Sequence, residues 1–156
     1  MGKAELLKEL NKLEFPQQTR SNVGGTYKGF VLGRITSWAG TGDKSGYRKI
    51  QSIKTGQPKY KEVYKLARQL IKEHDPNFKY TTIQFNKNHK SAKHVDGRNV
   101  GMSMMIGLGN YTGGELSVEG VKHDIKYKPV IFDGKNKEHW VEFFTPDRYS
   151  IIMYMI

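Results

Sequence analysis

The chain has 156 residues, enough for one domain with a single core, and it carries 26 Lys and Arg residues against 15 Asp and Glu residues. Its net charge of +11 is concentrated in residues 1–100, which hold 20 basic and 8 acidic side chains, whereas residues 101–156 hold 6 and 7. The absence of cysteine excludes disulfide bonds, thiol nucleophiles, Cys-ligated zinc and iron–sulfur clusters, and no apolar run reaches the roughly 18–20 residues of a membrane helix.

A basic excess in one part of a chain is typical of proteins that bind polyanions, of which nucleic acid is the commonest. A basic surface that only aids solubility is the alternative. Because residues 1–6 contain neither a myristoylation motif nor the start of a secretory signal, we expect a cytoplasmic or nuclear protein with no membrane partner.

The first half of the chain predicts two helices, a strand and a loop. The leucines of residues 3–13 fall on one helical face, which predicts a helix over these residues that Pro16 prevents from continuing. Residues 26–36 predict a strand, and residues 37–58, rich in Gly, Ser, Thr and Lys, predict a long surface loop. Within this loop, residues 40–46 lack the spacing of a phosphate-binding loop. Residues 60–74 predict a second helix that ends at Asp75-Pro76.

From Tyr80 onward the apolar pattern has a period of two. It predicts strands over residues 80–86, 92–96, 100–108, 115–119, 122–128, 130–133, 139–144 and 148–155. This order favours a mainly β fold of the α+β class, a jelly roll buttressed by N-terminal helices. We expect a single domain over residues 1–156, in which residues 1–79 give helical, basic support and a substrate-facing loop, and residues 80–156 form the jelly-roll core.

One histidine–carboxylate pair has the spacing of a metal site. His94 and Asp96 are separated by one residue, so on a strand their side chains would share a face and could bind one ion. His139 begins a later predicted strand and supplies a second imidazole. Two histidines and one carboxylate leave half of an octahedral shell open, the arrangement that non-haem Fe(II) oxygenases use for a cosubstrate and O₂.

Arg148 and Ser150 predict a site for an anionic cosubstrate. They share a face of the last predicted strand, and a guanidinium with a hydroxyl suits the distal carboxylate of 2-oxoglutarate. A surface salt bridge of Arg148 with Asp147 or Glu142 is the alternative. An unpaired arginine beside the apolar run that ends at Tyr154 would be costly, which favours a buried role in ligand binding.

Four motifs between Phe85 and Tyr154 occur in an order typical of one enzyme family. They are His94-Val95-Asp96-Gly97-Arg98-Asn99-Val100-Gly101, then Gly107-Leu108-Gly109-Asn110-Tyr111-Thr112-Gly113-Gly114-Glu115-Leu116, then Phe132-Asp133-Gly134 before His139, and last Arg148-Tyr149-Ser150 with Tyr154. With them the chain resembles the Fe(II)/2-oxoglutarate-dependent dioxygenases, and more narrowly the TET/JBP branch, which oxidises the 5-methyl group of pyrimidines in nucleic acid. The resemblance implies a double-stranded β-helix fold and a need for Fe(II), 2-oxoglutarate and O₂, with ascorbate as a candidate reductant.

The resemblance also implies roles for individual residues. It assigns iron to His94, Asp96 and His139, and 2-oxoglutarate to Arg148 and Ser150. Asn99 occupies the position of an asparagine that contacts the target base. Tyr154 occupies that of a tyrosine that stacks on the flipped base, and packing in the core is an equally good interpretation of Tyr154.

DNA is the favoured nucleic acid, and RNA stays open. The basic residues expected to grip its phosphates are Lys87, Lys90, Lys93 and Arg98, with a solvated loop as the alternative for any one of them. Cytosine-specific members of the branch carry a histidine where this chain has Ile156, so both 5-methylcytosine and thymine stay open as targets. The Cys-rich zinc-binding region of the animal enzymes is missing, which suggests a minimal phage, viral, algal or microbial version.

Two other functions are compatible with the same residues. One is a protein side-chain hydroxylase of the prolyl or lysyl type, whose basic rim would meet an acidic peptide. The other is a nucleic-acid-binding jelly roll that performs no catalysis, because a fold alone does not establish an activity.

Overall fold

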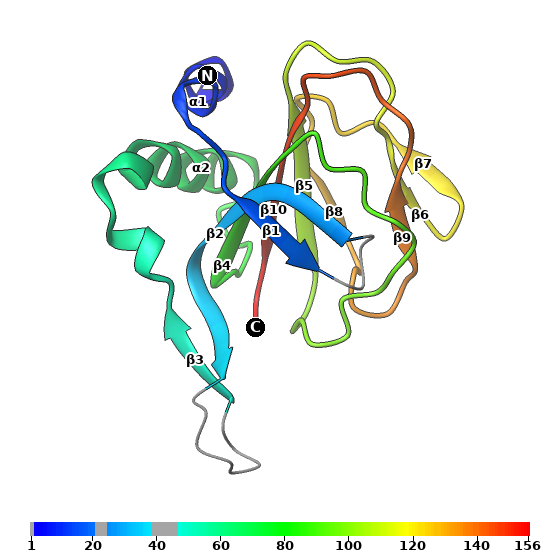
Figure 1. Cartoon of the computed structure of the whole chain (residues 1–156). Helices are drawn as coiled ribbons and strands as arrows, with labels where there is room; N and C mark the ends of the chain where they lie inside the picture. The colour runs from blue at the N-terminus through cyan, green and yellow to red at the C-terminus, as the bar shows by residue number, and fades with distance from the viewer. Residues whose placement is uncertain (1, 21–24, 39–46) are drawn as a thin grey trace.

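The structure, a computed structural model, describes residues 2–20, 25–38 and 47–156 and is built largely of antiparallel strands (Figure 1). The helices are α1 (Gly2–Lys12) and α2 (Lys61–His74), and the short 3-10 helices η2 (Ile53–Gly56) and η3 (Pro58–Tyr60) precede α2. The strands are β1 (Gln17–Arg20), β2 (Gly25–Trp38), β3 (Tyr47–Gln51), β4 (Thr82–Lys87), β5 (Ser103–Leu108), β6 (Leu116–Val118), β7 (Val121–His123), β8 (Val130–Phe132), β9 (His139–Val141) and β10 (Tyr149–Tyr154).

The strands form a larger and a smaller sheet that face each other. The larger sheet has the order β1-β2-β4-β10-β5-β8, with β3 paired to β2, and the smaller sheet has the order β7-β6-β9. Apolar side chains from both sheets meet in one cluster, which consists of Met105, Leu116, Val118, Ile125, Phe132 and Val141. Two facing antiparallel sheets with helices on one outer face make a jelly roll, so the predicted fold class is confirmed.

Both helices cover the face of the larger sheet that points away from the smaller sheet (Figure 1). Leu6 and Leu10 of α1 are buried there, together with the apolar stripe of α2. The stripe follows the helical period and consists of Val63, Leu66, Ala67, Leu70 and Ile71. The last turn of α2 is closed by a hydrogen bond from the Asp75 N–H to the Ile71 carbonyl (2.9 Å), and Pro76 follows.

Alternation along β4 and β10 gives the larger sheet two different faces. Phe85 of β4 and Ile151 of β10 pack into the core beneath the helices, where their side chains are fully buried. Their neighbours Asn86 and Ser150 point to the opposite face, toward the smaller sheet. A single pair of strands therefore supplies both the main core and one wall of the space between the sheets.

The predicted helices are confirmed to within one residue at each end, but one predicted strand is wrong. Residues 92–96 form no strand and contribute only an isolated bridge between His94 and His139. The alternating pattern in this segment is too short and too exposed to sustain a ladder. The other predicted strands from residue 80 onward are present and mostly shorter than expected.

The predicted surface loop over residues 37–58 is also wrong in part. β2 continues to Trp38 and pairs with β3, so that a long hairpin extends from the body of the protein (Figure 1). β1, which pairs with β2, was likewise not predicted. Both missed strands are rich in polar residues, and their sequences lack the alternation of apolar and polar residues by which strands are recognised. The glycine-rich residues 40–46 lie outside the described residues.

The first 79 residues thus contribute three strands to the larger sheet in addition to the two helices. No helix in the described part of the chain is both long and apolar enough to cross a bilayer.

Candidate metal centre and adjoining pocket

A polar pocket opens between the two sheets, on the face of the larger sheet that the helices leave free. Strands β4, β5 and β10 line it from one side, and β6 and β9 line it from the other. Its polar lining residues include Gln84, Asn86, His89, Ser91, His94, Asp96, Asn99, His139, Ser150 and Tyr154. Apolar residues such as Met105, Leu116 and Ile152 complete the walls, so that charge within the pocket is only partly screened by water.

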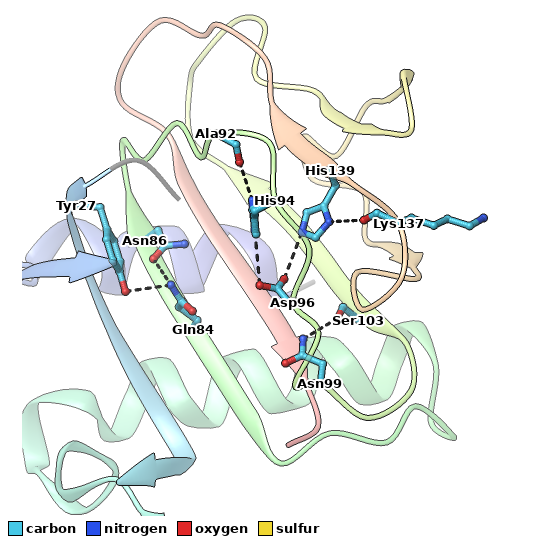
Figure 2. Close-up of polar contacts among 10 residues, drawn as sticks. All are labelled: Tyr27, Gln84, Asn86, Ala92, His94, Asp96, Asn99, Ser103, Lys137 and His139. Atoms are coloured by element: carbon cyan, nitrogen blue, oxygen red, sulfur yellow. Dashed lines mark hydrogen bonds and ion pairs between the residues drawn. The ribbon is translucent and has the colours of Figure 1, made fainter. Parts of the chain in front are cut away.

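Three metal-ligating side chains converge in this pocket (Figure 2). The candidate ligand atoms of His94, Asp96 and His139 all lie within 4.8 Å of one another. The Asp96 carboxylate lies 3.6 Å from Nε2 of His94 and 3.3 Å from Nε2 of His139. Ligands with bonds of about 2.1 Å to one ion are typically about 3 Å apart, so these separations suit a single cation.

Both imidazoles are oriented by backbone carbonyls behind them (Figure 2). Nδ1 of His94 lies 2.6 Å from the Ala92 carbonyl, and Nδ1 of His139 lies 2.9 Å from the Lys137 carbonyl. A carbonyl can only accept, so each Nδ1 carries a proton and donates it. In the neutral ring Nε2 is then a lone-pair acceptor aimed at the Asp96 carboxylate, which is itself an acceptor. Such an arrangement of acceptors is stabilised by a cation placed among them.

Backbone hydrogen bonds, not a regular strand, position the three side chains. The N–H of each of His94 and His139 donates to the carbonyl of the other, at 3.1 and 3.0 Å. The Asp96 N–H donates to the Gly134 carbonyl at 2.8 Å. His94 and Asp96 therefore share a face as expected, although the strand on which that expectation was based is absent.

The Arg148 side chain is completely buried and has no carboxylate partner among the described residues. Nη2 donates to the Gly114 carbonyl at 3.0 Å, whereas Nε and Nη1 are buried with no hydrogen-bond partner. Burial lowers the pKa of the guanidinium, against the opposing effect of nearby Tyr111. The alternative of a salt bridge is not realised: Asp147 accepts from Asn88, and Glu142 accepts from Ser117 and Trp140.

Aromatic rings and a glycine form the cradle around Arg148. The guanidinium carbon lies 5.4 Å from the ring centre of Tyr111 and 5.1 Å from that of Phe144. Gly114 has a φ of +69°, and a Cβ there would lie 2.7 Å from Nε of Arg148. The backbone at Gly114 can therefore approach the guanidinium only because the residue has no side chain.

The remaining predicted site residues fall into two groups. Ser150, Asn99 and Tyr154 line the pocket. The Asn86 amide lies at hydrogen-bonding distance from the Ser150 hydroxyl (3.5 Å), and the Asn99 amide lies at the same distance from the Ser103 hydroxyl. Asn99 is buried and Tyr154 is half-buried, and both side chains line the same pocket as the candidate metal ligands.

The predicted phosphate contacts are placed differently from one another. Lys90, Lys93 and Arg98 are exposed on the segment that also carries His89, Ser91 and the metal-ligand candidates. Nζ of Lys93 lies 4.9 Å from the ring centre of Trp140. Lys87, in contrast, follows the alternation of Phe85 and contacts the ring of Tyr149 on the helix side of the sheet. The structure does not bring Lys87 to the pocket.

Three residues that the sequence analysis did not single out belong to this region. The Tyr111 hydroxyl is buried beside Arg148 and has no hydrogen-bond partner among the described residues. Burial raises the pKa of Tyr111, so its hydroxyl stays protonated at neutral pH. Gln84 and Asn86 are hydrogen-bonded to each other in the pocket wall (Figure 2). In β4 the amides Gln84 and Asn86 alternate with the apolar Ile83 and Phe85, and this pattern could have signalled a polar cavity on one face of the strand.

No protein-family model matches the chain, and no curated protein sequence matches it. Solved structures do share its fold. A 2OG-Fe(II) oxygenase family oxidoreductase from Burkholderia pseudomallei superposes with a TM-score of 0.58 at 19% identity, over 97% of this chain and 76% of that one. NgTET1 in complex with 5mC DNA superposes with a TM-score of 0.60 at 14% identity, over 98% of this chain and 65% of that one. OsALKBH1 superposes with a TM-score of 0.54 at 12% identity, over 98% of this chain and 91% of that one.

These similarities show that the chain has the fold of the 2OG-Fe(II) oxygenases, including a TET protein and an AlkB homologue. The chain spans less than two thirds of the NgTET1 chain that it matches. The resemblance that the motifs predicted is therefore confirmed at the level of fold.

Proposed function

We propose that this protein is an Fe(II)- and 2-oxoglutarate-dependent dioxygenase that oxidises the 5-methyl group of a pyrimidine in nucleic acid, with DNA as the favoured substrate. The observation that carries the proposal is the group of acceptors formed by His94, Asp96 and His139, whose imidazoles are fixed by backbone carbonyls with Nε2 facing the carboxylate. A cation held by these three residues would keep further coordination positions for exchangeable ligands.

The cosubstrate half of the proposal rests on Arg148. A buried guanidinium with two unsatisfied nitrogens and no carboxylate partner among the described residues fits an anionic ligand that completes its hydrogen bonds. The Tyr111 hydroxyl beside it can donate a further hydrogen bond to the same anion, and Ser150 lines the pocket nearby. We assign the distal carboxylate of 2-oxoglutarate to this position.

Bound iron, with 2-oxoglutarate and O₂, would supply the oxidation of an unactivated C–H bond, which no side chain of the protein can perform alone. The protein's own residues bind and orient the reactants. His94, Asp96 and His139 hold the metal, Arg148 and Tyr111 hold the cosubstrate, and the apolar walls limit the access of water.

The substrate half of the proposal rests on the pocket entrance. Asn99 would hydrogen-bond the target base, and the Tyr154 ring would stack on it. The candidate metal ligands lie between two sheets, so a base within a duplex must be flipped out, or be presented by a single strand, to reach them. The exposed side chains of Lys90, Lys93 and Arg98 would contact neighbouring phosphates. The fold shared with NgTET1, solved with 5mC DNA, supports this choice of substrate.

Nucleoside mass spectrometry tests the proposal. DNA that contains 5-methylcytosine and thymine is incubated with the protein, Fe(II), 2-oxoglutarate and ascorbate, and an Asp96→Ala variant is run alongside. We expect a nucleoside with one added oxygen only when Asp96 is intact, and the parent base identifies the target. Succinate formed without a new nucleoside would support the metal centre and indicate that the substrate is a protein or a small molecule. Neither product would indicate a non-catalytic binding protein.

A further inference from the structure

A second hollow lies on the helix side of the larger sheet, and four lysines from four separate segments line it. They are Lys28 of β2, Lys54 of η2, Lys59 of η3 and Lys87 of β4. The link between α1 and β1 forms one side of the hollow, whose volume is about 830 Å³. Because strand alternation points Lys28 and Lys87 away from the candidate metal centre, this hollow is distinct from the pocket between the sheets.

The positive charge in this hollow is not neutralised within the described part of the chain. None of the four ammonium groups forms a salt bridge or a hydrogen bond with a described residue. Lys59 and Lys87 are placed over the rings of Tyr60 and Tyr149, at 5.1 and 5.7 Å from the ring centres. Among the described residues Glu14 is the only carboxylate in the lining, and it is not within 4.0 Å of any of these lysines.

The strand register places two of these lysines directly opposite each other. Lys28 and Lys87 are Cα partners in the antiparallel pair of β2 and β4. Like charges directly opposite each other on one face of a sheet are destabilising. A basic residue on a solvated surface gains nothing from such an arrangement, whereas a site for a multivalent anion requires cations that converge.

We propose that the lysine hollow binds a ligand with two or more phosphate groups. Phosphates carry the charge needed to neutralise four convergent ammonium groups, each of which offers donors for charge-assisted hydrogen bonds. The volume is within the range of about 300–1,000 Å³ typical of ligand pockets. The phosphates could belong to the backbone of a nucleic-acid strand or to a free oligophosphate, and the site does not depend on the iron chemistry proposed above.

Calorimetric titration of the full-length, metal-free protein with inorganic tripolyphosphate tests the proposal. The test variant is Lys28→Gln/Lys87→Gln, and the matched control is Lys8→Gln/Lys122→Gln, which removes the same charge from exposed positions elsewhere. We expect one anion per chain, with affinity lowered at least about tenfold in the test variant and less than about twofold in the control. Absence of binding by the wild-type protein, or equal losses in the two variants, would overturn the proposal.

Thermal unfolding without ligand separates a binding defect from a folding defect. Removal of two opposed charges should leave the melting temperature of Lys28→Gln/Lys87→Gln unchanged or raise it. If the double variant instead fails to fold, the single Lys54→Gln variant, which leaves the strand pair intact, is titrated with tripolyphosphate. Unaltered affinity in that variant would contradict the proposal.

A second titration identifies the source of the phosphates. The probe is an unmethylated single-stranded oligonucleotide, and its affinity is measured across a series of salt concentrations. If the hollow binds the backbone of a nucleic-acid strand, the salt dependence of binding should be weaker in Lys28→Gln/Lys87→Gln. The magnitude of the slope of log K against log salt should decrease by about 1.4, since each neutralised phosphate contributes about 0.7. If only tripolyphosphate binding is weakened, the ligand is a free oligophosphate.

Discussion

The two faces of the larger sheet are made from the same strands and serve different purposes. On β10, Ile151 packs beneath the helices while its neighbour Ser150 faces the pocket, and both side chains are almost fully buried. On the helix side, the buried Ile151 side chain is stabilised by apolar packing. Arg148, which directly precedes this strand in phase with Ser150, and the adjacent Tyr111 are instead buried with donors unsatisfied within the described part of the chain, although neither side chain lines the pocket itself. Equal exclusion from water can therefore indicate a core on one face and a ligand site on the other.

The largest expected effect is that of Asp96→Asn, which separates function from stability. We expect turnover to fall to background, because the carboxylate is the one anionic ligand in the candidate centre. In contrast, the melting temperature of the metal-free protein should be unchanged or higher, since the new amide can donate to the facing Nε2 acceptors of the histidines. An Asp124→Asn variant, altered at an exposed carboxylate, controls for the loss of charge. A large drop in the melting temperature would argue that Asp96 has a structural role.

Arg148→Met should weaken cosubstrate binding with little loss of stability. Removal of one partner of a buried charged pair typically costs about 2–5 kcal/mol of binding, roughly 30-fold or more in affinity for 2-oxoglutarate. Methionine fills a similar volume without the cost of burying a charge, so the free energy of unfolding without ligand should stay constant or rise. Equilibrium binding and urea unfolding measure the two quantities, with the exposed Arg34→Met as the control. Unchanged 2-oxoglutarate affinity would remove Arg148 from the site.

Adjacent substitutions on β10 compare the two faces directly. Ile151→Ala should lower the free energy of unfolding by about 2–5 kcal/mol, because it leaves a cavity beneath the helices. Ser150→Ala, one residue away and equally buried, should lower it by about 1 kcal/mol or less. Urea unfolding of both variants provides the measurement. Similar losses would mean that the pocket face is as tightly packed as the core.

Tyr111→Phe should have a smaller effect on cosubstrate binding than Arg148→Met. The ring beside Arg148 is kept, and only a buried hydroxyl without a partner in the described chain is removed. We expect about a tenfold loss of affinity for 2-oxoglutarate, the size of one hydrogen bond to a charged group. Burial raises the pKa of Tyr111, so its hydroxyl should stay protonated between about pH 6 and 8. The dependence of 2-oxoglutarate affinity on pH over this range should therefore be the same in the wild-type protein and in the variant. A change of affinity with pH that is present in the wild-type protein and absent in the variant would indicate that the hydroxyl ionises in this range.

The sequence predicted those features that rest on strong periodicity or rare spacing. The apolar stripe of α2 and the alternation of β10 identified a helix and a strand, and the pairing of His94 and Asp96 with a distant His139 picked out three side chains that converge. The strand expected to place His94 and Asp96 on one face is nevertheless absent. Reciprocal backbone bonds between His94 and His139 take its place, together with a single bond from the Asp96 N–H to the Gly134 carbonyl.

What escaped prediction depends on tertiary contacts that a linear pattern does not contain. Residues 48–51 of β3 are exposed, so the pairing with β2 is what defines this strand. Lys87 was grouped with Lys90 and Lys93 by nearness in sequence, but it is the last residue of β4 and so follows the strand's alternation to the helix side. Tyr111 lies beside Arg148 only because the chain folds the two residues together, so no local pattern marked it as a candidate site residue.

The central claim, that His94, Asp96 and His139 form a metal centre, is tested most directly by anaerobic calorimetric titration with Fe(II) alone. We predict one ion bound per wild-type chain, and no saturable binding by Asp96→Asn although that variant remains folded. Wild-type protein that binds no Fe(II), or an Asp96→Asn variant that binds it with wild-type affinity, would contradict the account.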